Sequence, residues 1–330
     1  MTTRRDLLLG LGASLLVLPL DALAQPKDRV WRVGFLATRR RPEPLEADMY
    51  GEVPKGLRDL GYVEGKDLVI EWRFADGKYE RLDGLAEELV RLPVDVIVTD
   101  GTPGTRAAQK ATRTIPIVFA AAGDPVATGL VKSFAHPGGN VTGNSQLLIE
   151  ASPKQMELMM TMIPRLTRLA VLWNPANANS LPNLKRLEAT APTVGVELLS
   201  LQARTPGEIE KAFAAMAESR SQAFIWIVDS FLIQELRLIS DLAIRHRLPS
   251  VGPLGEYPAA GGLMSYGIKR TGLYRRAATY IDKILKGANP GDLPVEQPTT
   301  IELVVNRRTA TTLGLKLSPE LLLLADRVIE

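Results

Sequence analysis

Small and polar residues follow a buried strand-like run at a point where this chain could bind a ligand. The run Val94–Thr99 leads into Asp100, Gly101 and Thr102, and a helical pattern begins near Gly104. The free backbone N–H groups at such a helix start suit a carboxylate or another anion, and the Thr102 hydroxyl adds a donor. The alternative is that the threonine only caps the helix. The segment lacks the Gly-Lys-Ser/Thr ending of a phosphate-binding P-loop, so we do not interpret it as one.

Carboxylate, amide and aromatic side chains stand at similar positions elsewhere in the chain. Asp124 and Asp229 each follow a strand and could accept a hydrogen bond from a ligand amine, or could equally cap the next helix. Asparagine amides offer a donor and an acceptor to a polar ligand, or they form turns. A tyrosine ring could stack on the apolar part of a ligand. The residues that we expect to contact a ligand are Leu36, Gly101, Thr102, Asp124, Asn144, Asn174, Asp229 and Tyr266.

Residue patterns that would indicate catalysis or metal binding are missing. The chain contains no cysteine and two histidines, which excludes thiolate metal sites, a cysteine nucleophile and metal sites built on several histidines. Neither a G-x-S-x-G elbow nor an H-E-x-x-H pattern occurs. Both His136, in a Pro-Gly-Gly turn, and His246, between two arginines, fit structural or solvated positions. We therefore expect no cofactor, no metal and no catalytic residues.

Composition and charge point to a folded protein without nucleic acid as a partner. The chain has 330 residues, of which 45% are hydrophobic and 23% charged, and its net charge is +3. That balance is ordinary for a globular protein and too even to indicate binding to nucleic acid. A chain of this length exceeds what one hydrophobic core usually supports, so two domains are expected.

The first 24 residues have the pattern of an export signal. Arg4 and Arg5 precede an apolar run from Leu7 to Leu20, and an A-x-A cleavage pattern ends at Ala24. The run is too short to span a bilayer comfortably, and the paired arginines resemble a twin-arginine signal. A Sec signal or an uncleaved anchor are the alternatives. The sequence therefore predicts export to a periplasm, with cleavage between Ala24 and Gln25.

The rest of the chain alternates β-rich runs with helical patterns, which is typical of βαβ units and parallel sheets. The order of elements is the same in two halves. Four landmarks of the first half recur at an offset of about 130 residues: Leu36 and Trp173, Gly61 and Gly195, Asp100 and Asp229, and Pro116 and Pro249. We therefore predict an α/β protein with two Rossmann-like lobes whose strand ends face one ligand cleft.

The C-terminal segments are expected to return to the lobes and not to form a third domain. A helix is predicted at 271–285, a Pro-rich crossing at 290–298, a strand at 301–305 and a final helix at 318–328. The first lobe is then residues 25–144 with about 268–292. The second lobe is residues 145–267 with about 293–330. Several chain crossings between them would make a hinge.

The sequence resembles a known family over nearly its whole length after the export signal. The segments that carry the resemblance are Thr114–Phe119, Gly123–Val126, Pro137–Gly143, Ala170–Pro175, Gly261–Gly267, Tyr280–Gly287 and Leu293–Pro298. They resemble the periplasmic substrate-binding proteins of ABC transporters, specifically the tryptophan/tyrosine-type group. Pro253–Tyr257 and Thr99-Asp100 depart from the pattern of that group at positions that border the expected cleft.

The resemblance implies a class I periplasmic binding protein fold with three crossings between the lobes. It also implies the capture of a small polar molecule, an amino acid or similar, and its delivery to an ABC transporter permease in the inner membrane. The expected protein is a monomer without enzymatic activity. Two other functions stay open: a ligand-sensing module of a membrane receptor, and an exported two-lobe enzyme of the transferase type.

Overall fold

The computed structural model describes residues 29–147, 151–298 and 300–330. The predicted export signal and its cleavage site near Ala24 and Gln25 lie outside the described residues. Trp31–Glu330 forms one compact unit, in which two sheets each carry their own helices. No helix in the described part of the chain is long and apolar enough to cross a membrane.

The first sheet is five-stranded and entirely parallel, in the order β2-β1-β3-β4-β5. Its strands are β1 Trp31–Ala37, β2 Leu68–Phe74, β3 Val96–Thr99, β4 Ile117–Ala122 and β5 Val141–Ser145. The central strands are buried on both faces, as expected for a parallel sheet covered by helices. We call this sheet and its helices the first lobe.

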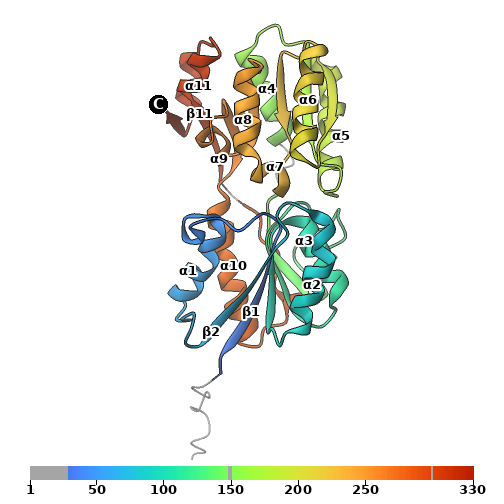
Figure 1. Cartoon of the computed structure of the whole chain (residues 1–330), viewed down its shortest axis with the longest axis vertical. Helices are drawn as coiled ribbons and strands as arrows, with labels where there is room; N and C mark the ends of the chain where they lie inside the picture. The colour runs from blue at the N-terminus through green and yellow to red at the C-terminus, as the bar shows by residue number, and fades with distance from the viewer. Residues whose placement is uncertain (1–28, 148–150, 299) are drawn as a thin grey trace, which may run out of the picture. The chain divides into compact units, whose positions relative to one another are not determined.

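Helices cover both faces of the first sheet. α1 (Glu52–Asp59) and α10 (Arg270–Leu285) pack side by side on one face (Figure 1), while α2 (Leu82–Arg91) and α3 (Gly101–Ala111) cover the other. α1 and α10 approach closely at Gly56, where a Cβ would lie 2.7 Å from the Cβ of Ala278. A late segment of the chain thus completes the core of the first lobe.

The second sheet has seven strands in the order β12-β11-β10-β9-β8-β6-β7. Its strands are β6 Arg168–Trp173, β7 Glu197–Gln202, β8 Ala223–Trp226, β9 Ser250–Leu254, β10 Met264–Ile268, β11 Ile301–Asn306 and β12 Arg327–Ile329. All neighbours are parallel except β10 and β11. We call this sheet and its helices the second lobe.

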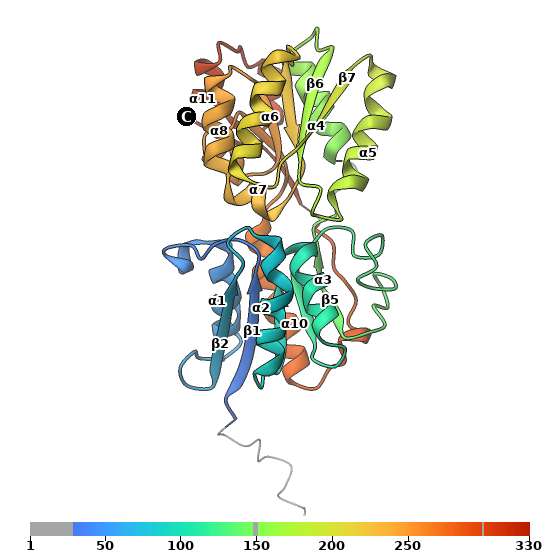
Figure 2. The same cartoon turned by 45° about the vertical axis from the view of Figure 1, so that its right-hand side comes forward.

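Two layers of helices enclose the second sheet. One face packs against α4 (Ala151–Met162) and α5 (Ser180–Thr190), with α11 (Arg307–Thr312) and α12 (Pro319–Leu324) at its edge. The other face packs against α6 (Pro206–Glu218), α7 (Ser230–Gln234), α8 (Leu236–Arg245) and α9 (Glu256–Ala259). Figure 2 shows α6 and α8 side by side on this second face.

The chain passes between the two lobes three times. It leaves the first sheet after β5 and enters α4, returns after β10 into α10, and crosses again before β11. The third crossing runs beside the first, because Asn144 and Glu296 form a parallel β-bridge. Of the described residues, those at 146–147, around Lys269 and at 297–298 are therefore where the lobes can hinge.

The predicted final helix at 318–328 is wrong in its second half. Ser318 caps α12, whose first described turn begins at Pro319, but the helix ends at Leu324. Arg327–Ile329 then forms β12, which pairs with β11. A β-branched pair, Val328 and Ile329, favours this strand over a helix that would have been mostly exposed.

Candidate functional site

The carboxyl ends of the strands in the two lobes face each other, and side chains bridge them. The Tyr79 hydroxyl, from the segment that precedes α2, donates to Asp229 Oδ2 over 2.5 Å. The same hydroxyl accepts a hydrogen bond from the backbone N–H of Phe231 at 3.2 Å. Tyr79 also packs against the cores of both lobes. One tyrosine therefore joins the first lobe to the start of α7.

A second bridge lies at the solvent-exposed rim. The backbone N–H of Arg40 donates to Gln234 Oε1 over 2.8 Å, and the Arg40 guanidinium lies 2.7 Å from Glu235 Oε1. Ion pairs as exposed as this one contribute little to stability. The backbone-to-amide bond is the better-defined part of this contact.

A third bridge is made by the loop that follows β6. Asn179 Oδ1 accepts a hydrogen bond from the backbone N–H of Asp124 at 3.0 Å. Gly123 lies directly beneath the Asn179 amide, where any Cβ would overlap the amide atoms. On the same edge of the first lobe, a Cβ at Gly101 would lie 3.1 Å from Ser230 Oγ. Both glycines therefore allow the lobes to approach closely.

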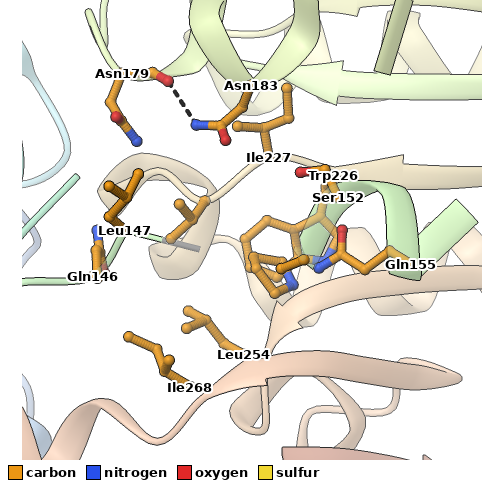
Figure 3. Close-up of a pocket in the computed structure, with 13 residues that line it drawn as sticks. Gln146, Leu147, Ser152, Gln155, Asn179, Asn183, Trp226, Ile227, Leu254 and Ile268 are labelled. Atoms are coloured by element: carbon orange, nitrogen blue, oxygen red, sulfur yellow. Dashed lines mark hydrogen bonds between the residues drawn. The ribbon is translucent and has the colours of Figure 1, made fainter. Parts of the chain in front are cut away.

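A cavity lies against this contact region and is lined by ends of β8, β9 and β10 and by the starts of α4 and α5. The space in it that a water-sized molecule can enter is about 30 Å³, and all the space between its lining atoms, open solvent at its mouth included, is about 470 Å³. Its described lining residues are Gln146, Leu147, Ala151, Ser152, Gln155, Asn179, Asn183, Trp226, Ile227, Val228, Pro253, Leu254 and Ile268. Figure 3 shows Asn179 and Asn183 at one side of this cavity, Leu254 and Ile268 at the opposite side, and Gln146 and Gln155 on its flanks. None of these described lining residues is ionisable.

Two polar atoms of the cavity lining are buried without a hydrogen-bond partner among the described residues. They are the indole nitrogen Nε1 of Trp226 and the amide oxygen Oε1 of Gln146. Buried polar groups are nearly always paired, because an unpaired donor or acceptor costs free energy. Trp226 is fully buried beneath Gly252, where a Cβ would overlap the indole. The lining therefore offers one unused donor and one unused acceptor.

Asp100, which ends β3, belongs to a buried ionic cluster. Its Oδ1 lies 3.1 Å from the Arg270 guanidinium and accepts from the Tyr274 hydroxyl, while Oδ2 accepts from Tyr50. Burial alone would raise the pKa of Asp100, but the Arg270 and Arg39 guanidiniums and the tyrosine hydroxyls hold it below its ordinary value. This carboxylate is turned into the first lobe and ties the start of α10 to β3.

Asp229, which follows β8, is buried among neutral donors. Its Oδ1 accepts from Asn174 Nδ2 at 3.0 Å and from the Leu232 N–H at 3.1 Å, and Oδ2 accepts from Asn177 Nδ2 at 3.1 Å and from Tyr79. Burial raises the pKa of Asp229 above its ordinary value, although these donors favour the charged form. Both of its oxygens are already engaged.

None of the eight residues expected to contact a ligand is among the described lining residues of the cavity. Gly101, Thr102 and Asp124 do come together at the edge of the first lobe that faces the second. Thr102 Oγ1 accepts from the Gly123 N–H at 3.1 Å, and Asp124 Oδ1 accepts from the N–H groups of the next turn. Asn174 and Asp229 meet across the facing edge.

Three of these eight residues lie elsewhere. Leu36 is fully buried in the core under α2 and α3. Asn144 donates to the carbonyl of Leu273 over 3.0 Å, which ties β5 to α10. Tyr266 lines a separate hollow between α4 and the end of α5. Ligand contact by the eight residues stays a prediction.

Sequence reasoning missed the residues that line the cavity. Gln146 and Leu147 lie in a crossing that carries no motif, and Trp226 lies in an apolar run that predicts a buried strand and no ligand contact. Asn179 carried a signal, because Asn174, Asn177 and Asn179 fall within six residues directly after β6. Such a run of amides at a strand end is more than one turn needs.

The family model described as ABC transporter substrate binding protein matches residues 44–329, which is most of the chain. The chain belongs to this family. It is a substrate-binding protein of an ABC transporter, with the two-lobe fold of class I periplasmic binding proteins, and it captures a small molecule for that transporter. Members of this family typically act outside the cytoplasmic membrane, in the periplasm or the extracellular space.

Individual relatives of this substrate-binding protein agree with the family. A tyrosine-binding protein of Clostridioides difficile is 28% identical over 262 residues, which cover 79% of this chain and 75% of the relative. A Streptococcus pneumoniae domain crystallised in complex with L-Trp is 25% identical, with a TM-score of 0.83, and the match covers 91% of this chain and 100% of that one. A solute-binding protein of Bacillus halodurans with bound myo-inositol is 14% identical with a TM-score of 0.56, covers 87% and 98%, and shows the fold alone.

Proposed function

We propose that the cavity lined by Trp226 and Gln146 is the solute site of this substrate-binding protein, and that its solute is an amino acid or a similar small polar molecule. The observation that carries the proposal is the buried Trp226 indole N–H, which has no partner among the described residues. In a solute receptor, such a donor is satisfied when the ligand arrives. The relatives that bind tyrosine or L-Trp support an amino acid as the first class to test.

Apolar and polar residues of the lining have different roles in binding the solute. Leu147, Leu254 and Ile268 offer apolar surface to the body of the solute, while Trp226 Nε1 donates to an acceptor and Gln146 Oε1 accepts from a donor. Pockets of this kind gain affinity from apolar burial and specificity from a few placed polar groups. The described lining holds no charged side chain, so charged ends of a solute must be met by amides, Ser152 and backbone groups.

The proposal extends to the export of the protein, its location and its transporter. The export signal at residues 1–24 is removed near Ala24, and the mature protein works in the periplasm as a monomer. It hands its solute to an ABC transporter permease in the inner membrane and does not transform it. These statements rest on the pattern of the N-terminal residues, the absence of catalytic motifs in the sequence, and the family.

The test measures solute binding by the mature protein. Thermal melting against single amino acids, with L-tyrosine and L-tryptophan first, identifies a binder, because a ligand at 100 times its Kd adds about 2.7 kcal/mol of stability. Trp226→Phe removes the indole N–H and should weaken binding of that solute by about tenfold, since a buried acceptor is left unpaired. Calorimetry gives the Kd of both proteins.

Trp173→Phe is the matched control. Trp173 is also a largely buried indole of the second lobe, but its Nε1 donates to Ser200 Oγ over 2.8 Å and it does not line the cavity. Its replacement should leave the Kd within about twofold of wild type. The proposal fails if no amino acid or similar small solute shifts the melting temperature, or if both replacements weaken binding equally.

A further inference from the structure

Asn179 lines the solute cavity and also touches the opposite lobe. Its Oδ1 accepts the hydrogen bond from the Asp124 N–H, whereas Figure 3 shows its amide nitrogen directed toward the cavity. We propose that Asn179 couples solute binding to lobe closure: its Nδ2 donates to an acceptor of the solute while its Oδ1 holds the first lobe. This inference rests on the proposed solute site.

The asparagine is held from behind by its own loop. Its backbone N–H donates to Asn177 Oδ1 over 3.0 Å, and its carbonyl accepts from Asn183 Nδ2 at 2.8 Å. Asn177 in turn donates to Asp229, the residue that receives Tyr79 from the first lobe. With its backbone fixed in this way and the whole residue 5% exposed, Asn179 has little freedom beyond rotation of the amide.

Gly123 lies in direct contact with the Asn179 amide. Any Cβ at Gly123 would overlap the Asn179 amide. The glycine cannot retreat easily, because its N–H donates to Thr102 Oγ1 over 3.1 Å and its carbonyl accepts from Ser145 Oγ at 2.7 Å. The contact between Gly123 and Asn179 is therefore available only when the lobes are closed and residue 123 lacks a side chain.

Solute binding and lobe closure are coupled because the oxygen and the nitrogen of the Asn179 amide face different partners. Turning the Asn179 amide by half a rotation would place its NH₂ against the Asp124 N–H, donor against donor, which would open the contact. A solute acceptor, such as a carboxylate or carbonyl oxygen, fixes Nδ2 toward the cavity and so fixes Oδ1 toward Asp124. A ligand that binds better to one state shifts the population toward it, and the coupling is reciprocal.

The chemistry also sets a requirement on the solute. Only a molecule with a hydrogen-bond acceptor at the Asn179 end of the cavity can hold the amide in the closing orientation. A solute of the same shape without that acceptor would bind to the second lobe and leave the lobes free to open. Asn179 thus acts as a positioning residue whose effect appears in closure as well as in affinity.

The experiment measures the distance between the lobes. The chain contains no cysteine, so two introduced cysteines, Lys66→Cys in the first lobe and Glu218→Cys in the second, take spin labels at exposed positions without background. The pulsed-EPR distance distribution gives the closed fraction. It is recorded for this labelled protein and for versions that also carry Asn179→Ala, Gly123→Ala, both changes, or Asn306→Ala, each without ligand and with saturating L-tyrosine or L-tryptophan.

We expect Asn179→Ala and Gly123→Ala each to lower the closed fraction. In the double variant, Gly123→Ala should have no further effect, because the amide that it strikes is gone. Asn179→Ala should also abolish the closing response to a bound amino acid and weaken its binding by about tenfold. Asn306→Ala is the control, since Asn306 is buried like Asn179 but bonds only within the second lobe, to Pro258 and Thr309, and does not line the cavity.

The results separate the two proposals. The coupling is overturned if Gly123→Ala lowers the closed fraction equally with and without Asn179. It is also overturned if the closed fraction of Asn179→Ala equals that of the parent protein. If Asn306→Ala and Asn179→Ala behave alike, Asn179 has no special role and the coupling is again overturned. If neither amino acid changes the melting temperature or the distance in the parent, the proposed solute class fails, while the ligand-free variants still decide whether Asn179 and Gly123 govern closure.

Discussion

Asp100 and Asp229 occupy equivalent places in the two lobes and serve different ends. Each follows a buried strand and precedes a helix, and each is almost inaccessible to solvent. The Asp100 carboxylate faces inward, to Arg270 and two tyrosines of its own lobe. The Asp229 carboxylate caps α7 and receives asparagines together with Tyr79 from the opposite lobe. The shared topology of the two lobes thus places an aspartate after β3 and after β8. The side chains around each aspartate decide its role.

The contrast is between a charged and a neutral environment. Asp100 has a full counter-charge, and its pKa lies below the ordinary value. Asp229 has donors but no cation in contact among the described residues, and burial raises its pKa. A buried ion pair is costly to break, whereas a single neutral hydrogen bond contributes about 0.5–1.5 kcal/mol. The ion pair of Asp100 therefore suits a permanent contact between β3 and α10. The hydrogen bonds of Asp229 suit a contact that forms when the lobes close and breaks when they open.

The largest effect is expected from removing the counter-charge of Asp100. Arg270→Met leaves a buried carboxylate without its cation and should lower the free energy of unfolding by about 3–5 kcal/mol. Urea denaturation measures the loss. Arg276→Met, on the same helix, is the control, because Arg276 pairs with Glu296 at 44% side-chain exposure and should cost at most about 1 kcal/mol. Equal losses for the two variants would mean that Asp100 does not depend on its ion pair.

A smaller effect that depends on pH is expected from Asp229→Asn. An asparagine has one acceptor oxygen in place of two, so the variant should lose about 1–3 kcal/mol at low pH. Because the folded pKa of Asp229 is raised, its favourable contribution is full below the ordinary value of 3.8 and is lost as pH rises through the folded pKa. The gap between wild type and variant should therefore narrow as pH rises above about 4.

For Asp100 we expect the opposite dependence of its stabilising contribution on pH. Its folded pKa is lowered, so its contribution is present above 3.8 and is lost as pH falls through the folded value. Urea melts of wild type, Asp229→Asn and Asp100→Asn at a series of pH values from about 3 to 7 give both slopes. A gap that widens with rising pH would contradict the assignment of Asp229 as the carboxylate disfavoured by burial.

The lobes were predictable from sequence because strands buried on both faces leave a strong local signal. Runs such as Ile117–Ala122 are apolar throughout, and the repeat of Asp100 and Asp229 after β3 and β8 reflects one topology used twice. The C-terminal strand β12 left no such signal. Its three residues acquire their structure from pairing with β11, a contact that local sequence does not encode.

The cavity was less predictable for the same physical reason. Its lining comes from a crossing segment, two helix starts and three strand ends, which meet only once both lobes are packed. Sequence reasoning could place Asp124 and Asp229 near strand ends, but it could not show that their carboxylates are occupied by turns and helix caps. Nor could it show that Arg270 lies against Asp100, 170 residues earlier in the chain.

The smallest effect, and the one that best separates the two aspartates, is expected from Tyr79→Phe. The change removes one hydroxyl, the donor to Asp229 and the acceptor for the Phe231 N–H, while the ring still packs on both cores. Unfolding should become easier by about 0.5–1.5 kcal/mol. Tyr62→Phe is the matched control, since the Tyr62 hydroxyl donates to Asp282 over 2.9 Å entirely within the first lobe.

The two tyrosine variants should lose similar stability yet differ in lobe closure. The bond of Tyr79 exists only when the lobes meet, so its loss should lower the closed fraction and weaken solute binding by about two- to tenfold, whereas Tyr62→Phe should change neither. Distance measurements with the spin labels described above, together with calorimetry, test this. If both variants close alike, Asp229 is fixed in its own lobe as firmly as Asp100 is, and the contrast between a permanent joint and a breakable one is lost.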